Sequence, residues 1–332
     1  MSDTKAQIVA LLKKQMLKPV QISKKLKLSR QALHRHLKVL LEQKQIEKQG
    51  AAPNVFYSHT SQKPESRVQE SAGFFKKNLL PNYFKELNID GPYKSFYEAC
   101  KPKSRNMPDF AFMVDSAAVY SSNIEGNTLN LNSFLNSRSL TKKLRPKEAR
   151  EIEDLVAAYS FSQNLPLNEA NLKKAHAILS KDFVNKARQG IYRMESVGVF
   201  SNRGIEYLAI EAQYLNNEMS EFFEVISDLL TIKLSVSETF FWASWLHLMM
   251  ALIHPFSDGN GRIARLCEKW FLIQKLGPQM VFLPSEEHYF KLRPEYYSAL
   301  RIGPNYWEVN FGITTVFLKL LPGSLKPLEK ST

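Results

Sequence analysis

Residues 254–265 hold a histidine, an aspartate, two glycines and two arginines within twelve positions, and they constrain the local fold more than any other stretch. The run is HPFSDGNGRIAR. Apolar residues recur beyond it at helical spacing as far as residue 273, and Gly277-Pro278 is a helix stop signal. The sequence therefore predicts a tight glycine turn that opens directly into a helix.

The glycine turn has the composition of an anion site. Gly259 and Gly261, on either side of Asn260, allow successive backbone N–H groups to turn inward. The helix that follows points the positive end of its dipole at the same place. Arg262 and Arg265 share one side of the first helical turn, where guanidinium groups can grip phosphate oxygens in pairs. The turn therefore predicts a phosphate-binding loop.

Two further side chains of the run suit chemistry on a phosphate. Asp258 is a hard oxygen ligand, of the kind that holds Mg²⁺ on a nucleotide. His254 is expected to end the preceding helix, and an ordinary histidine pKa of about 6.5 leaves it unprotonated at neutral pH. We therefore expect His254 to accept a proton from a hydroxyl that attacks phosphorus.

This run resembles the signature of the Fic family, His-x-Phe-x-(Asp or Glu)-Gly-Asn-Gly-Arg-x-x-Arg, and matches it at every specified position. Members of that family are mostly helical and typically transfer AMP from ATP to a Ser, Thr or Tyr hydroxyl of a target protein. The resemblance implies ATP as co-substrate with Mg²⁺, His254 as general base and Asp258 as metal ligand. It also implies that the nucleotide phosphates are bound by Gly259, Asn260, Gly261, Arg262 and Arg265.

A second segment matches the inhibitory pattern of that family, (Ser or Thr)-x-x-x-Glu-(Gly or Asn). It is formed by Ser121, Glu125 and Gly126. Ser121 and Glu125 are one helical turn apart. The resemblance implies that Glu125 pairs with Arg265 and occupies the space that the γ-phosphate needs. An enzyme of this kind is expected to rest in an inhibited state.

Residues 190–200 resemble the hairpin flap of the same family. Val197 and Val199 alternate with small residues, including Gly198, as in an exposed strand. Such a strand offers main-chain groups to an extended target peptide and can align a hydroxyl with His254. An ordinary surface hairpin is the alternative interpretation.

Composition limits the class of protein. The chain has 332 residues, of which 44% are hydrophobic, and two cysteines, too few for a disulfide framework. The amino terminus is charged and lacks an apolar signal core, and the apolar stretch 240–253 is broken by polar residues. We interpret that stretch as a buried core helix, and we expect a cytoplasmic protein that does not contact a membrane.

Basic charge is concentrated near the amino end of the chain. Residues 1–60 hold twelve Lys or Arg against three Asp or Glu, a net +9 of the total +13. Apolar spacing predicts helices around residues 8–12, 20–26 and 30–44, and then a hairpin with strands at 45–48 and 55–58. This order resembles the winged helix-turn-helix modules of bacterial transcription regulators.

The third helix of such a module enters the major groove of DNA. Its exposed face is expected to carry Arg30, Gln31, His34, Arg35 and Lys38. Because the charge lies on one small module, DNA binding would depend strongly on salt. A solvated helical face and a winged helix that binds only proteins are the alternatives.

Taken along its length, the chain is expected to have a mainly α fold. A Fic-type helical bundle with a small β-hairpin flap is preceded by a small winged helix-turn-helix domain. The expected boundaries are 1–60 for the winged helix, 61–75 for a polar linker and 76–332 for the Fic-like domain.

Several functional alternatives stay open at this point. A DNA-bound regulator that uses the pocket as a nucleotide sensor would have no need of a base, so His254 argues against it. Transfer of UMP, phosphate or phosphocholine is open, because the motif specifies the phosphate end of a substrate more firmly than its base. Removal of AMP from the target and a homodimer are open as well.

Overall fold

The protein divides into two compact units, Met1–Arg67 and Val68–Thr332, each with a hydrophobic core of its own. The structure is a computed structural model that describes residues 2–14, 17–43, 45–49, 55–59, 66–81, 83, 89–100, 109–201 and 204–325. Within these residues each unit is mainly helical and holds one two-stranded sheet. The predicted fold class is confirmed.

The smaller unit has three helices followed by an antiparallel hairpin. Its elements are α1 (Ser2–Lys14), α2 (Pro19–Leu26), α3 (Arg30–Glu42), β1 (Ile46–Gln49) and β2 (Phe56–His59). The Ser29 hydroxyl caps α3 by accepting the Ala32 N–H at 3.2 Å. Leu33, Leu37 and Leu40 lie on the buried face of α3. The predicted order is therefore present, with both strands one residue further along the chain.

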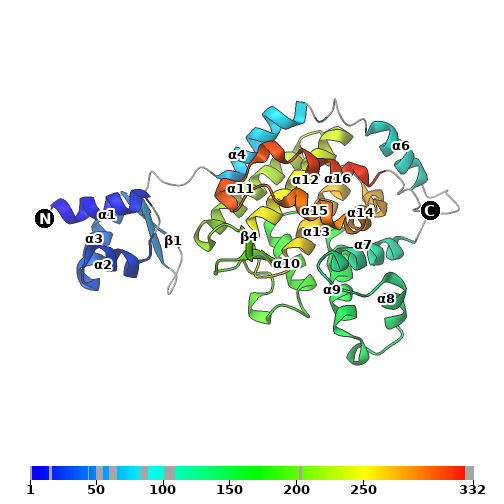
Figure 1. Ribbon diagram of the computed structural model, residues 1–332, viewed down its shortest axis with the longest axis horizontal. Helices are drawn as coiled ribbons and strands as arrows, with labels where there is room; N and C mark the ends of the chain where they lie inside the picture. The colour runs from blue at the N-terminus through cyan, green and yellow to red at the C-terminus, as the bar shows by residue number, and fades with distance from the viewer. Residues whose placement is uncertain are drawn as a thin grey trace. The chain divides into compact units, whose positions relative to one another are not determined.

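The larger unit is a helical bundle in which α12 (Val236–Ile253) and α13 (Asn260–Leu276) pack side by side (Figure 1). The other longer helices of this unit are α4 (Arg67–Phe74), α6 (Asp90–Ala99), α7 (Phe110–Ile124), α8 (Leu131–Ser137), α9 (Lys147–Ser162), α10 (Glu169–Leu179), α11 (Ala212–Thr231), α14 (Ser285–Lys291), α15 (Arg293–Leu300) and α16 (Thr315–Gly323). Short helical turns are η1 (Phe75–Leu79), η2 (Lys142–Leu144), η3 (Lys186–Arg188), η4 (Pro278–Phe282), η5 (Tyr306–Glu308) and η6 (Phe311–Ile313).

Local sequence signals set the ends of the two central helices. A capping box begins α12: the Ser235 hydroxyl accepts the Glu238 N–H, and the Glu238 carboxylate accepts the Ser235 N–H. Gly277, at a φ of 103°, ends α13 at the predicted stop. Among the described residues α12 is the one helix whose length and composition would suit a membrane span, and 83% of it is buried inside the fold. It is the core helix that the sequence predicted.

Residues 67–75 differ from the predicted linker. They are helical, and Val68 and Phe75 are fully buried. The Phe75 ring packs against Phe241 with 5.9 Å between centroids, and the Val68 N–H donates to the Glu218 carboxylate at 3.0 Å. Two apolar residues seven positions apart share one helical face, although the residues between them are mostly polar. This segment therefore belongs to the larger unit.

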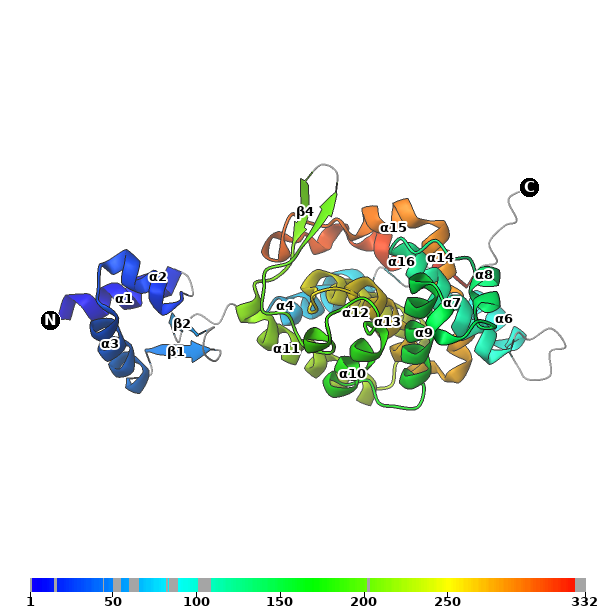
Figure 2. The same ribbon diagram turned by 90° about the horizontal axis from the view of Figure 1, so that it is seen from below.

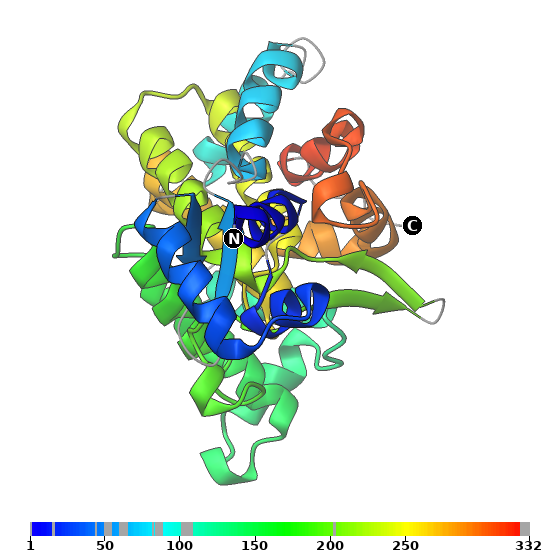
Figure 3. The same ribbon diagram turned by 90° about the vertical axis from the view of Figure 1, so that its left-hand side faces the viewer.

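The hairpin of the larger unit also begins later than the predicted flap at 190–200. Its strands are β3 (Gly198–Ser201) and β4 (Gly204–Leu208), in which Gly198 pairs with Leu208 and Val199 with Tyr207. Figures 2 and 3 show this hairpin extending away from the helices of its unit. Val197 lies at its base, where its carbonyl oxygen accepts the Ala209 N–H at 3.1 Å. Alternation of valines located the first strand, but it gave no information on the partner strand.

The separate core of the smaller unit leads to a stability prediction. Leu37 is 2% exposed and packs only within that core, so Leu37→Ala should lower the free energy of unfolding of this unit by about 2–5 kcal/mol. Calorimetric unfolding of the full chain should show a shift of the smaller unit's transition alone. Val20→Ala, at a side chain that is 61% exposed, is the control and should change stability by less than about 0.5 kcal/mol. An equal shift of both transitions in Leu37→Ala would contradict independent cores.

Candidate active site

His254 ends α12 in a left-handed backbone conformation, with φ 53° and ψ 59°. Few residues other than glycine adopt this region, and those that do are often found at functional sites. The imidazole Nδ1 lies 3.2 Å from the carbonyl oxygen of Ala251. We assign the proton to Nδ1, which donates to that oxygen, so Nε2 carries the lone pair that can accept a proton.

The surroundings of His254 keep its ring neutral at pH 7. Burial lowers the pKa of the imidazole below its ordinary value of 6.5, and the charge of Arg193 acts in the same direction. The Ala251 carbonyl and the carboxylates of Glu125 and Asp258 oppose this shift without cancelling it. A neutral imidazole with an available Nε2 is suited to act as a general base.

Arg193 fixes the turn that follows α12. Its guanidinium is 4% exposed and donates to the carbonyl oxygens of His254 at 2.6 Å and Ile253 at 3.2 Å. Its backbone N–H donates to the carbonyl of Pro255 at 3.0 Å. A helix leaves its last carbonyls without intrahelical partners, and a buried arginine satisfies them here. The role of Arg193 was not predicted from the sequence, where its one local signal is a charge among apolar residues.

The glycine turn is closed by its own asparagine. The Asn260 amide accepts the Phe256 N–H at 2.9 Å and donates to the Phe256 carbonyl at 2.8 Å. Gly259 caps α13 at a φ of 81°. The side chain of Asn260 therefore holds the turn, and the anion donors of the turn are the unpaired backbone N–H groups at the start of α13.

His176 supports the same turn from α10. Its Nδ1 accepts the Gly190 N–H at 3.0 Å, so its Nε2–H donates to the carbonyl of Asp258 at 2.9 Å. The ring stacks on Phe256 with 3.7 Å between centroids. Burial lowers the pKa of His176 to about 4, which keeps this support neutral. His176 is thus a structural residue that connects α10 to the glycine turn.

Arg262 lies beside the turn with guanidinium N–H groups that have no hydrogen-bond partner among the described residues, although Nη1 is within ion-pair distance of Glu151. The residue is 8% exposed, and its guanidinium carbon lies 4.0 Å from the ring centre of Phe183. Its Nη1 is 3.5 Å from a Glu151 carboxylate oxygen. Within the described part of the chain, neither Nε nor Nη1 has a hydrogen-bond partner. Buried donors of this kind suit an anionic ligand.

Arg265 lies at the back of the site and is completely buried. Its Nε donates to the Ser121 hydroxyl, and its Nη2 donates to the Ser121 carbonyl, both at 2.9 Å. Nη2 also donates to the Glu125 carboxylate at 2.7 Å. The structure thus brings the segment around α7 against α13, as the family resemblance implied.

The Glu125 carboxylate lies directly against the glycine turn. Partial burial opposes its ionisation, but the charge and the hydrogen bond of Arg265 outweigh this effect and hold the pKa of Glu125 below its usual value. A Cβ atom at Gly261 would collide with the Glu125 Oε1, so this glycine is required for the approach. Gly126, at a φ of 99°, turns the chain away after Glu125.

Asp258 is exposed and offers one carboxylate oxygen to a ligand. The other, Oδ1, accepts the Gly259 N–H at 2.6 Å. No group of three or more His, Cys, Asp or Glu side chains that could hold a metal is found among the described residues. A single carboxylate beside phosphate donors fits Mg²⁺, which keeps several waters and binds through one or two carboxylates plus substrate phosphates.

The residues expected to read DNA lie in the other unit. All five of them, Arg30, Gln31, His34, Arg35 and Lys38, are exposed on α3. The residues of the run 254–265 and of the segment 121–126, in contrast, meet in one site of the larger unit.

Each unit contains a segment that matches a protein-family model. The model described as Fic/DOC family matches residues 166–272, which hold α10, α11, α12, the whole glycine turn and most of α13. The model described as bacterial regulatory protein, arsR family, matches residues 2–48.

Curated relatives are distant. The chain is 27% identical over 191 residues to the protein adenylyltransferase fic-1 of Caenorhabditis elegans, and 28% identical over 188 residues to that of Caenorhabditis briggsae. Each match covers 54% of this chain and 34% of the relative. The chain thus spans about a third of the length of the curated relatives that it matches.

Solved structures share the fold. A Fic family protein from Desulfovibrio desulfuricans G20 has a TM-score of 0.57 at 21% identity, covering 75% of this chain and 73% of that one. A Fic domain containing signaling protein from Bacteroides thetaiotaomicron VPI-5482 has a TM-score of 0.54 at 20% identity, covering 72% and 92%. The chain therefore carries a Fic/DOC-family domain that includes the glycine turn, with an ArsR-type helix-turn-helix domain at its amino end.

Proposed function

We propose that the larger unit is a protein adenylyltransferase that moves AMP from ATP to a Ser, Thr or Tyr hydroxyl of a target protein. One observation carries the proposal: a neutral His254, the donors of Arg262 and the start of α13 converge on a single glycine turn. The distant relationship to protein adenylyltransferases supports AMP as the transferred group.

In the proposed reaction the target hydroxyl attacks the α-phosphorus of ATP. The new O–P bond forms as the bond to pyrophosphate breaks, and the hydroxyl proton moves to Nε2 of His254. The N–H groups of the turn and the Arg262 guanidinium stabilise the phosphate charge. Asp258 would hold Mg²⁺, which neutralises further phosphate charge when it is bound. Arg193 keeps His254 in place by binding the carbonyls around it.

We further propose that Glu125 inhibits this transfer. Its carboxylate occupies an anion position beside Arg265 and the glycine turn, where a γ-phosphate would otherwise bind. The Glu125 carboxylate and a γ-phosphate would repel each other strongly if both were bound to the Arg265 guanidinium. ATP in its reactive position and Glu125 in its present position are therefore mutually exclusive.

Removal of the Glu125 carboxylate should activate the enzyme. Glu125→Gly should raise ATP-dependent labelling of target proteins about tenfold or more, because it removes a charge-assisted hydrogen bond that competes with phosphate. Labelling with [α-³²P]ATP measures this, and [γ-³²P]ATP should give no label. Glu125→Gln, which keeps an acceptor but loses the charge, should be intermediate. An unchanged rate in Glu125→Gly would eliminate the inhibitory role.

The role of His254 as general base can be tested in the Glu125→Gly variant. His254→Ala in Glu125→Gly should lower labelling by about 10²–10⁴-fold, the usual contribution of a general base. Because a base must be unprotonated and the pKa of His254 lies below 6.5, the Glu125→Gly rate should be level from about pH 7 upward and fall as pH decreases below 6.5. The charge of Glu125 raises the pKa of His254, so its loss should lower that pKa further. The decrease in rate should then occur at a lower pH. Labelling that survives without the imidazole would refute the assignment.

We propose that the smaller unit binds duplex DNA through α3. The match to arsR-type regulators and the five exposed side chains on α3 support this role. Cationic side chains on a helix of this kind bind phosphates and base edges in the major groove.

Charge removal on α3 should weaken DNA binding. The double variant Arg35→Ala, Lys38→Ala should bind a mixed-sequence duplex about tenfold more weakly near 0.1 M salt, and the slope of log K against log salt should fall by about one to two. Fluorescence anisotropy measures both quantities. The double variant Lys76→Ala, Lys94→Ala, at two exposed lysines of the larger unit, is the charge-matched control and should leave binding unchanged. Equal weakening in both variants would point to non-specific charge effects and against α3.

A further inference from the structure

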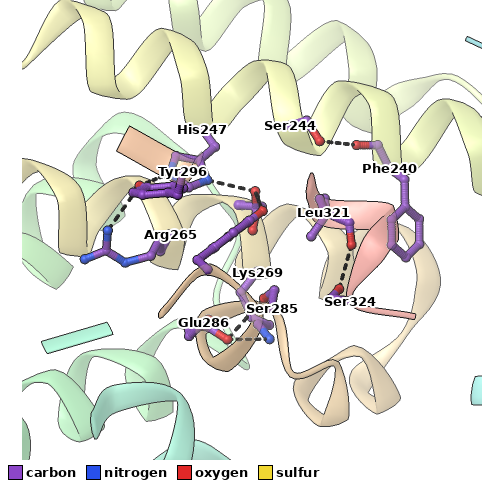
Figure 4. A network of polar contacts seen from close by, with 12 residues as sticks. Phe240, Ser244, His247, Arg265, Lys269, Ser285, Glu286, Tyr296, Leu321 and Ser324 are labelled. Atoms are coloured by element: carbon purple, nitrogen blue, oxygen red, sulfur yellow. Dashed lines mark hydrogen bonds and ion pairs between the residues drawn. The ribbon is translucent and has the colours of Figure 1, made fainter. Parts of the chain in front are cut away.

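Arg265 has a third partner, which belongs to neither the glycine turn nor the inhibitory segment. Its Nη1 lies 3.2 Å from the hydroxyl oxygen of Tyr296 on α15. Tyr296 is 1% exposed, and Figure 4 shows its hydroxyl between Arg265 and His247. The guanidinium is therefore held on one edge by Ser121 and Glu125 and on the other by Tyr296.

A buried chain of hydrogen bonds fixes the Tyr296 hydroxyl. The hydroxyl lies 2.9 Å from His247 Nε2, and His247 Nδ1 lies 2.8 Å from a Glu268 carboxylate oxygen. Arg265 can only donate to the tyrosine oxygen. The tyrosine O–H therefore donates to Nε2, and Nδ1–H donates to Glu268. All members of the chain are buried, and each of its hydrogen bonds has one donor and one acceptor in this assignment. The second carboxylate oxygen of Glu268, Oε1, has no hydrogen-bond partner among the described residues.

The tyrosine keeps its proton in this position. Burial raises the pKa of Tyr296 above its usual value, more than the nearby charge of Arg265 lowers it. The hydroxyl is therefore a permanent acceptor for Arg265 Nη1 and a permanent donor to His247. Unlike the Glu125 carboxylate, the neutral hydroxyl does not repel a phosphate, so a phosphate would not have to displace it.

We propose that Tyr296, oriented by His247 and Glu268, is a positioning residue that keeps the Arg265 guanidinium directed toward the γ-phosphate position when Glu125 is absent from it. This inference rests on the proposed function of the same site. In this structure Nη2 binds Glu125 and Nη1 binds Tyr296. In the proposal a phosphate replaces Glu125 at Nη2, while the contact of Nη1 with Tyr296 is kept. Without the hydroxyl, Nη1 would lose a partner in a buried place, and the guanidinium would turn to find another.

The test compares binding of Mg-ATP with that of Mg-ADP, since they differ by the γ-phosphate. In the Glu125→Gly protein, isothermal titration should show tighter binding of ATP than of ADP. Adding Tyr296→Phe should weaken ATP binding about tenfold, the usual effect of a lost hydrogen bond to a charged group, and leave ADP binding nearly unchanged. The ratio of the two dissociation constants is a readout that a general loss of packing would not move.

Tyr289→Phe is the matched control. The Tyr289 ring is buried 5.1 Å from that of Tyr296, and its hydroxyl donates to the same Glu268 carboxylate at 2.8 Å, but the structure gives it no contact with Arg265. It should keep the ATP-to-ADP ratio of the Glu125→Gly protein. Thermal unfolding of each variant ensures that titrations are made on folded protein.

The outcomes separate the two proposals. An unchanged ratio in Tyr296→Phe, or an equal loss in Tyr289→Phe, would overturn the positioning role. If Glu125→Gly by itself bound ATP and ADP equally, the assignment of Arg265 to the γ-phosphate would fail first, and with it the proposed inhibition.

Discussion

The buried charge of Arg265 is the constraint on which the rest of the site depends. A guanidinium that is removed from water must be paired with an anion and hydrogen-bonded, because isolated burial of a charge is very costly. In this structure the anion is Glu125, and Ser121 and Tyr296 accept hydrogen bonds from further N–H groups of the guanidinium. Only another anion can replace the carboxylate without a large increase in the free energy of burying Arg265. In the proposed enzyme, release of Glu125 and binding of a phosphate would therefore be coupled by electrostatics as well as by space.

The geometry of the glycine turn depends on residues far apart in the sequence. Asn260 closes the turn from within, His176 binds its backbone from α10, and Arg193 binds the last carbonyls of α12. The hairpin takes part in the same arrangement, since the Tyr207 hydroxyl on β4 donates to the Leu252 carbonyl at 2.8 Å. In the proposed enzyme, a target strand docked on this hairpin would be held in a fixed relation to His254. Rigid placement of nucleophile and base supplies a large part of the rate in such reactions.

Features that depend on a few neighbouring residues could be predicted from the sequence. The Ser29 cap, the glycine turn and the stop at Gly277 are of this kind. The contact of Glu125 with Arg265, 140 residues apart, was implied by a family pattern and by no local signal. The roles of Arg193 and Tyr296 depend on long-range contacts that no periodicity encodes. The helix at 67–75 was not predicted for the same reason. Its two buried residues, Val68 and Phe75, contact partners in helices much later in the sequence.

The way in which Glu125 is held also limits how the proposed inhibition could be relieved. Ser121 lies within α7 and binds Arg265 through both its hydroxyl and its carbonyl, so a movement of the whole helix would remove contacts that support Arg265. Glu125 itself lies just past the end of α7, with a side chain that is 28% exposed and a glycine after it. The Tyr297 hydroxyl anchors the last turn of α7 at the Ile124 carbonyl. A rotation of the Glu125 side chain toward solvent would break its contact with Arg265 and leave the contacts of Ser121 in place. An activating signal in the proposed enzyme would therefore need to move only the residues at the end of α7.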